Sequence, residues 1–227
     1  MLRKYLIESM TQYELAHKTA QHNAALPIEQ GGLGLHPNNT ALERARAMGY
    51  TTKAYHGTSH NFTGFDNKHI GKHFGDTAGH FFTSSTTHMF SPKTTHEDMY
   101  SAGAYAKHSA ELSGNPPHIL PVLLKMKHPK IISDDSDGAG VLSLVERGNY
   151  TAGEYFDDHV IKHGHDSMVV SDTGSETDLP NGLIRNPDTY INRNKYDEIY
   201  AVQNPHQIRS IHAAFDPMRQ HESDLLA

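Results

Sequence analysis

The stretch 51-TTKAYHGTSHNFTGFD-66 joins a strand pattern to a histidine and a glycine, and a phenylalanine-rich loop follows. Residues 51–55 include β-branched and aromatic residues, which favour strands, so we expect a strand there that turns at His56 and Gly57. A glycine lets another molecule approach the backbone closely, because it carries no side chain. Taken alone, the pair is better explained by a turn histidine that caps a strand.

Working outward from this strand, the chain alternates short strands with a few helices. We expect strands over 80–84, 118–132, 166–170, 197–203 and 207–215. Helices are expected over 94–112, where Thr94 and Glu97 form a capping box, and over 151–163, ending at Gly164. The polar segments 85–99 and 171–195 are expected to be loops, and the second is long enough to have a function. This order of elements predicts an α+β fold.

The amino-terminal part is expected to be a helical arm, residues 1–25, added to a domain over 26–216. Leu2, Leu6, Met10, Tyr13 and His17 follow at steps of three and four residues, as on one face of a helix. A loop over 27–39 then leads to a helix over 41–48, with a Thr40–Glu43 capping box. The polar residues 217–227 are expected to form a flexible tail.

Composition limits the classes of function. The chain has 227 residues, no cysteine and a formal net charge of −6. Disulfides and thiolate metal sites are therefore excluded, and the lack of cysteine fits a cytoplasmic protein. The negative charge argues against binding nucleic acid by neutralising phosphates, although a nucleotide in a pocket remains compatible. Apolar runs are too short to cross a membrane, so no membrane partner is expected.

Nineteen histidines raise the possibility of a metal site. His69 and His73 are four residues apart, as are His159 and His163, and such pairs share a face of a helix. Neither pair has the glutamate of a metalloprotease motif, and with this many histidines such spacings arise by chance. We therefore expect surface histidines and no metal, with a histidine-metal hydrolase as the less favoured alternative.

Several pieces of sequence in a fixed order resemble the ADP-ribosyltransferase superfamily, in its diphtheria-toxin and poly(ADP-ribose) polymerase branch. They are YHGT at 55–58, FFTS at 81–84, Ala104-Tyr105-Ala106 and a late acidic residue before a strand. The chain is more similar still to the transferase domain of phage polyvalent proteins. That likeness rests on 31–50, 121–129, 161–170 and 200–210, and it covers about residues 26–216. It implies split mixed or antiparallel sheets with flanking helices.

The resemblance also implies a binding site for NAD, which would be a substrate. In this superfamily the histidine bonds the adenosine-side ribose, and the glycine backbone pairs with the nicotinamide carboxamide. His56 and Gly57 would take these roles, with Thr58 beside them. Tyr105 and Phe81 would stack on the nicotinamide ring, and Ser84 closes the second motif. Phe81 departs from the family pattern, which has a tyrosine at this position. Alternatively, Phe81, Phe82 and Tyr105 are simply part of the hydrophobic core.

Glu198 is the candidate catalytic acid, implied by the family's late carboxylate. It would hold the nicotinamide ribose and accept a proton from the acceptor. Aligning the family pattern on Tyr200 and Pro205 puts the acid at Ile199 instead, and one residue changes the face of a strand. A bulge could restore Glu198, Asp197 or Gln207 could replace it, or the acid could be lost.

The expected function is therefore that of a mono-ADP-ribosyltransferase, encoded by a phage or mobile element and acting in a bacterial cytoplasm. Its partners would be NAD and a macromolecular acceptor, expected to be a host protein, with nucleic acid left open. The loop 171–195 is a candidate contact for that acceptor. Two alternatives share the fold: an NAD glycohydrolase, and an NAD-binding or protein-interaction module without catalysis.

Overall fold

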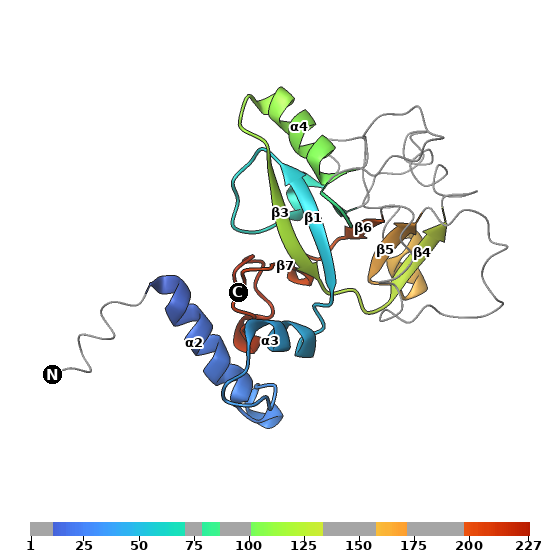
Figure 1. Ribbon diagram of the computed structural model, residues 1–227. Coiled ribbons are helices and arrows are strands. Elements are labelled where there is room, and N and C mark those ends of the chain that lie inside the picture. Colours follow the sequence, from blue (N-terminus) through green and yellow to red (C-terminus); the bar gives the residue numbers. More distant parts are fainter. Residues whose placement is uncertain (1–10, 71–78, 87–100, 134–157, 172–197) are drawn as a thin grey trace.

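The computed structural model describes residues 11–70, 79–86, 101–133, 158–171 and 198–227 (Figure 1). These residues form three α-helices and one open sheet of seven strands, so the fold is α+β as predicted. The strands are β1 (Thr52–Thr58), β2 (His80–Thr83), β3 (His118–Leu124), β4 (Pro129–Ser133), β5 (Ser167–Ser171), β6 (Ile199–Val202) and β7 (Ile208–Ser210).

The strand order is β4-β5-β6-β2-β1-β3-β7, and only the β4–β5 pair is parallel. β1 and β3 share a ladder of seven residue pairs, from Thr52–Leu124 to Thr58–His118. β1 and β2 share a single pair, Tyr55–Thr83. One weak joint therefore divides the sheet into a three-stranded half, β1-β3-β7, and a four-stranded half, β4-β5-β6-β2. We call this joint the seam.

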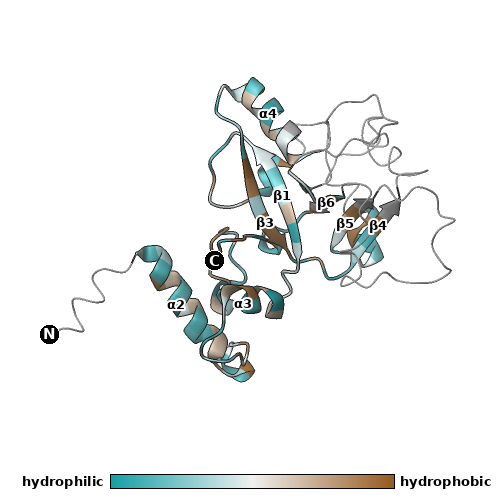
Figure 2. Ribbon diagram, viewed as in Figure 1, coloured by the Kyte–Doolittle hydropathy of each residue, from teal (hydrophilic) through white to brown (hydrophobic). Residues whose placement is uncertain are grey.

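The main core lies on one face of the sheet. Paired residues of neighbouring strands point to the same face, and successive residues point to opposite faces. The seam and ladders thus place Ala54, Phe82, Val122 and Tyr200 together, all of them buried. Phe65, from the loop after β1, packs onto the same cluster. Figure 2 shows the apolar stretches along the strands and the more polar helices around them.

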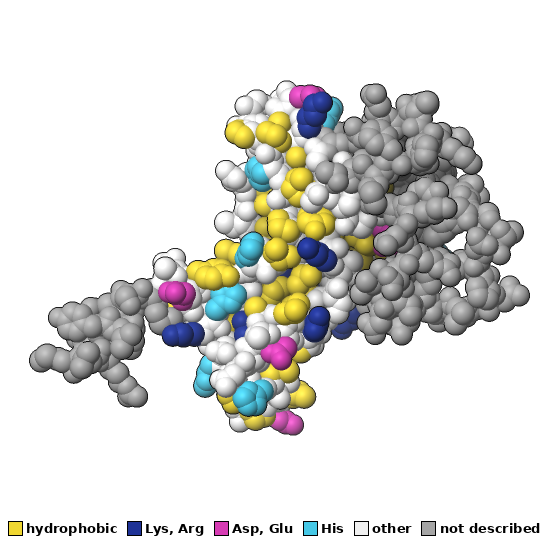
Figure 3. Space-filling view, in the orientation of Figure 1, with side chains coloured by type: hydrophobic (Ala, Val, Ile, Leu, Met, Phe, Trp, Pro, Cys, Tyr) yellow, Lys and Arg dark blue, Asp and Glu magenta, His cyan; other side chains and the backbone are white. Residues whose placement is uncertain are grey.

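Helix α4 (Ala102–Ser113) covers part of the opposite face, over β1. The evidence is a close approach of the first turn of α4 to Gly57, described below, and a hydrogen bond from the Ala102 amide to the Thr83 hydroxyl at 3.1 Å. Figure 3 shows the face seen in Figure 1, where hydrophobic side chains gather along the β1–β3 region. α4 begins later than the predicted helix at 94, and residues 94–100 with the Thr94–Glu97 box lie outside the described residues.

Helix α3 (Ala41–Ala47) is confirmed, together with its predicted capping box. The Thr40 hydroxyl accepts a hydrogen bond from the Glu43 amide, and the Glu43 carboxylate accepts one from the Thr40 amide. α3 packs with Tyr50 and Phe215 in a second, smaller core cluster. The buried Arg44 joins it to the carboxyl-terminal segment by donating a hydrogen bond to the Ala214 carbonyl at 2.8 Å.

The amino-terminal arm differs from the predicted one. Helix α2 (Gln12–Ala25) begins at a capping box that the sequence analysis missed, Thr11 with Glu14. The predicted apolar stripe is wrong where it can be compared, because Tyr13 is half exposed and the buried residues are Ala20 and Ala24. Small alanines let α2 pack closely against α3 and the short helix η8 (Pro217–Arg219). Residues 1–10 lie outside the described residues.

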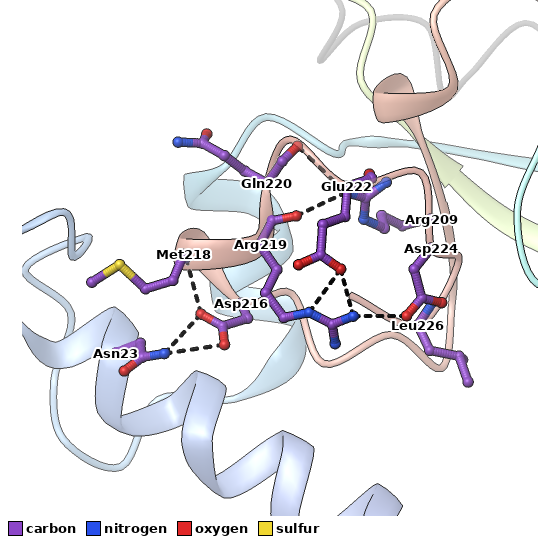
Figure 4. A network of polar contacts seen from close by, with 9 residues as sticks. All are labelled: Asn23, Arg209, Asp216, Met218, Arg219, Gln220, Glu222, Asp224 and Leu226. Atoms are coloured by element: carbon purple, nitrogen blue, oxygen red, sulfur yellow. Dashed lines mark hydrogen bonds and ion pairs between the residues drawn. The ribbon is translucent and has the colours of Figure 1, made fainter.

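The carboxyl-terminal residues 217–227, predicted as a flexible tail, fold back onto the domain. Leu225 is buried in the main core, and its amide bonds the Thr63 carbonyl at 2.8 Å. Arg219 forms ion pairs with Glu222 and Asp224, at 2.6 and 2.8 Å (Figure 4). The polar residues that suggested a flexible tail instead form ion pairs with one another within this segment.

The remaining elements follow the sequence with shifted boundaries. The predicted strands over 197–203 and 207–215 are shorter as β6 and β7, and the predicted pair over 118–132 is β3 and β4. The helix expected over 151–163 is described only from 158, where a short η4 (Ile161–His163) ends at Gly164 in a left-handed conformation. None of the helices in the described part of the chain has the length and apolar character that crossing a bilayer requires.

Candidate functional site

His56 lies inside β1 and not at a turn after it, so the predicted end of the strand at residue 55 is wrong. β1 continues to Thr58 because its pairing with β3 continues to the end. The His56 side chain points to the core face, at ring distances of 5.0 Å from Phe65, 5.5 Å from Phe82 and 6.1 Å from Phe62. The imidazole is thus embedded in an aromatic cluster beside the seam.

One hydrogen bond determines the proton positions on the His56 ring. Nδ1 lies 2.8 Å from the Phe81 carbonyl oxygen, which can only accept, so Nδ1 carries the proton. Burial lowers the pKa of His56 below its usual range, with a partly opposing contribution from this bond. The ring is therefore neutral at pH 7, and its Nε2 is a hydrogen-bond acceptor. This side-chain bond crosses the seam where the strand ladder has ended.

Gly57 is required by packing, whatever else it does. A Cβ atom placed on it would lie 1.8 Å from the Ala102 carbonyl oxygen and 2.7 Å from the Ala106 nitrogen. Both are backbone atoms of α4, which cannot rotate away as a side chain would. The helix therefore lies directly on this glycine. Gly57 adopts an extended conformation in the ladder, so close approach and not an unusual backbone angle explains the residue.

Thr58 and the following serine hold the turn after β1. The buried Thr58 hydroxyl accepts a hydrogen bond from the His60 amide at 3.1 Å. Ser59 contacts the hydroxyls of Ser109 and Ser113 on α4, both at 2.7 Å. Thr58, predicted beside a bound nucleotide, thus has a structural role at the start of the loop.

Glu198 lies on the same face as His56. The Ser84 amide donates to the Glu198 carbonyl at 2.9 Å, and the Glu198 amide donates to the Ser84 hydroxyl at 2.8 Å. The Tyr200 hydroxyl donates to the Glu198 carboxylate at 2.7 Å, and Tyr200 itself belongs to the main core. Tyr200 therefore orients a partly buried carboxylate next to Ser84. β2 lies between β1 and β6, and the register places Glu198 in the row of Ser84, two residues along the strands from the row of His56.

The other predicted residues point to the opposite face. Ile199 pairs with Thr83, whose hydroxyl meets α4, so Ile199 shares the α4 face. Phe81 alternates with Phe82 and also points there, and Tyr105 is carried by α4 itself. The structure thus divides the predicted set in two: His56, Ser84 and Glu198 lie on the core face, while Phe81 and Tyr105 do not.

Of the alternatives to Glu198, Gln207 has a structural role. Gln207 is buried, and its amide nitrogen donates to the carbonyls of Lys125 and Asp166, at 2.9 and 3.1 Å. It therefore ties the end of β3 to the start of β5 and is structural. Asp197 lies outside the described residues, as do most of the segments 85–99 and 171–195.

Sequence reasoning missed one neighbour of His56. His80 starts β2 on the same face, 4.9 Å from the Phe65 ring, and its Nε2 contacts the Asn67 side-chain oxygen at 3.1 Å. Burial lowers the pKa of His80 to about 4, and the nearby His56 adds to the shift. The phenylalanines after YHGT were the available signal, because Phe65 packs against both histidines and Phe62 packs against His56.

The metal hypothesis receives no support from the geometry of the described residues, among which no three histidine or acidic side chains converge as metal ligands. His163 is exposed at the end of η4, His159 is partly buried before it, and His73 lies outside the described residues. The His69 side chain is exposed beside the short helix η2 (Asn67–His69).

Comparisons with protein-family models, with curated proteins and with solved structures found no match to this chain. The functional interpretation therefore rests on the site itself. The site consists of the neutral imidazole of His56, with Nε2 as an acceptor, and the oriented carboxylate of Glu198. Both lie on one face of the sheet, on opposite sides of the seam.

Proposed function

We propose that the protein is an NAD-dependent mono-ADP-ribosyltransferase, which cleaves the bond between nicotinamide and ribose and transfers ADP-ribose to a macromolecule. The observation that carries the proposal is that His56 and Glu198 share one face on opposite sides of the seam. The ordered resemblance of residues 26–216 to the superfamily is the second support. A substrate with two riboses offers hydroxyl groups to both side chains.

His56 would bind a ribose of NAD. Its Nδ1 proton is engaged by the Phe81 carbonyl, so Nε2 has a lone pair for a sugar hydroxyl to donate to. A charged imidazolium would lack that acceptor, and the lowered pKa keeps the ring neutral. The role is one of binding and orientation.

Glu198 would carry the chemistry. Breaking the C–N bond releases nicotinamide with the bonding electron pair and leaves positive charge on the ribose. A carboxylate beside the sugar stabilises that charge, as in glycoside hydrolysis. The nucleophile of the acceptor then attacks the same carbon, and its proton passes to the carboxylate. The Tyr200 hydrogen bond at 2.7 Å fixes the carboxylate for both tasks.

The aromatic platform differs from the expected one. Phe81 and Tyr105 point away from His56, whereas Phe62 lies near it and is only partly buried. A flat, cationic nicotinamide ring is attracted to the face of an aromatic ring. We therefore assign the platform to Phe62, with Phe65 supporting it edge-on at a ring distance of 5.0 Å.

The test is to incubate the purified protein with NAD, with and without bacterial lysate, and to follow nicotinamide release and transfer of labelled ADP-ribose. Glu198→Gln keeps the size of the side chain and removes the charge, so we expect at least a hundredfold loss of rate. Glu111→Gln, at an exposed position of α4, is the matched control and should behave as wild type.

Each outcome decides something. Release that depends on Glu198 but needs no lysate identifies an NAD glycohydrolase, and label on macromolecules identifies the transferase. Turnover that survives Glu198→Gln moves the catalytic role to another carboxylate. Tight NAD binding without turnover identifies a binding module, and neither binding nor turnover contradicts the proposal as a whole.

A further inference from the structure

A pocket of about 490 Å³ is lined by residues that follow β3 and β6 and precede β5. The two lysines in its lining, Lys125 and Lys127, follow β3, and Asp166 precedes β5. Gln203 and Asn204 come after β6, whereas Glu198 comes before it. Gln203 and Asn204 are therefore separated from Glu198 by the length of β6. Its size is within the range of pockets that bind small molecules.

The one carboxylate in the pocket lining is occupied by other groups. Asp166 accepts hydrogen bonds from the Lys127 amide at 2.8 Å, the His128 amide at 3.0 Å and the Ser167 hydroxyl at 2.8 Å. It therefore caps the turn between β3 and β4, and its oxygens are not paired with the ammonium groups. Two lysines against one such carboxylate leave the pocket positively charged.

The charge on Lys125 is poorly compensated. Its ammonium lies 5.6 Å from the centre of the Tyr50 ring, and the buried Arg209 guanidinium lies 5.6 Å from the same ring. Burial lowers the pKa of Lys125, and repulsion from Lys127 and Arg209 lowers it further. Within the described ranges, neither Lys125 nor Lys127 forms an ion pair with a carboxylate, in contrast to Arg219 with its two acidic partners.

Neutral donors surround the two lysines. The Asn67 side-chain oxygen is bound to His80, which leaves the Asn67 amide nitrogen as a donor. Gln203 lines the same pocket. Ammonium and amide donors together match a ligand with several charged oxygens.

We propose that this pocket binds a phosphate-bearing small molecule, with Lys125 and Lys127 as the groups that neutralise the phosphate. The net charge of −6 disfavours a long polyanion such as a nucleic acid, because phosphate neutralisation drives that kind of binding. The proposal is independent of the NAD site, since the two regions share no residue that either one needs.

The test is calorimetric titration of the full chain with inorganic phosphate, with pyrophosphate and with a short single-stranded oligonucleotide. We expect pyrophosphate to bind more tightly than phosphate, and the affinity to fall as chloride is raised. Lys125→Gln and Lys127→Gln should each lower the pyrophosphate affinity at least tenfold. Lys127 is exposed, so its variant keeps the fold if the partly buried Lys125 proves to be needed for stability.

The matched control is Lys53→Gln. The Lys53 ammonium also lies over a tyrosine, 5.4 Å from the Tyr55 ring, but it belongs to β1 and not to the pocket. Pyrophosphate that fails to bind, or that binds Lys127→Gln and Lys125→Gln as it binds wild type, would overturn the proposal. An oligonucleotide that binds more tightly than pyrophosphate would overturn the assignment to a small molecule.

Discussion

The two neighbours of β1 are joined to it in different ways. β3 pairs with β1 along its whole length, through seven residue pairs. β2 pairs with it once, at Tyr55–Thr83, and the contact is completed by side chains: the His56 imidazole on the Phe81 carbonyl and the rings of Phe65 and Phe82. Most substitutions leave the backbone hydrogen bonds of a ladder in place. A contact made by side chains, as at the seam, is lost when one of those side chains is replaced.

The two sides of β1 also differ in residue type. A buried histidine costs free energy when it is charged, and an apolar residue would fill its place without that cost. The seam nevertheless contains the buried His80 and the partly buried His56, and it ends near a carboxylate. The ladder side has Lys53, Ala54 and Val122, which are ordinary strand residues.

The largest effect should come from adding one methyl group at the seam end of β1. Gly57→Ala would place its Cβ 1.8 Å from the Ala102 carbonyl, so α4 must move away from the sheet. We expect a loss of about 3 kcal/mol in the free energy of unfolding, at the high end for overpacking. Urea denaturation measures it.

Gly114→Ala is the control for this substitution. Gly114 has a φ of 75° and no atom within 4 Å of an added Cβ, so the substitution tests backbone strain without a clash. Its cost should be about 1 kcal/mol, as for a non-glycine residue in the left-handed region. Equal losses for both variants would mean that α4 is not held against Gly57 as described.

Lowering the pH should reduce the stability of the protein through the histidines at the seam. The pKa of His80 is about 4 in the folded protein and about 6.5 when unfolded, so the unfolded state binds the proton more tightly. Stability is therefore complete above pH 6.5 and falls as the pH drops towards 4. From pH 7 to 4.5 we expect a loss of about 2 kcal/mol from His80, with His56 acting in the same direction.

Urea denaturation across this pH range checks the expectation against His80→Gln. The variant cannot titrate at this position and should lose about 2 kcal/mol less than the wild type over the same interval. An identical pH dependence for the two proteins would show that His80 is not held neutral by the fold.

The elements near strong local signals were predictable from sequence. The Thr40–Glu43 box fixed the start of α3, and the alternation of short strands and helices indicated α+β. The tail was mispredicted because its burial depends on Leu225 meeting the distant Thr63, and composition cannot show a contact across the chain. The described part of the arm is helical as predicted, but its predicted apolar stripe is wrong for a related reason, since its alanines pack closely while its larger apolar residues do not.

The candidate site was predictable only in part. The motif order drew attention to His56, Ser84 and Glu198, and the register places all three on one face. Sequence alone could not assign faces to Phe81 and Tyr105, because a shift of one residue reverses them. Nor could it separate the packing role of Gly57 from a binding role, since both require the absence of a side chain.

The central claim is that NAD binds at the seam, on the face shared by His56 and Glu198. The most direct test is to titrate isotopically labelled protein with NAD and to follow its backbone amide signals by NMR. We expect the signals of residues 56–58, 84 and 198 to shift together and to saturate. Shifts confined to residues 203–207, or no shifts at all, would contradict NAD binding at the seam.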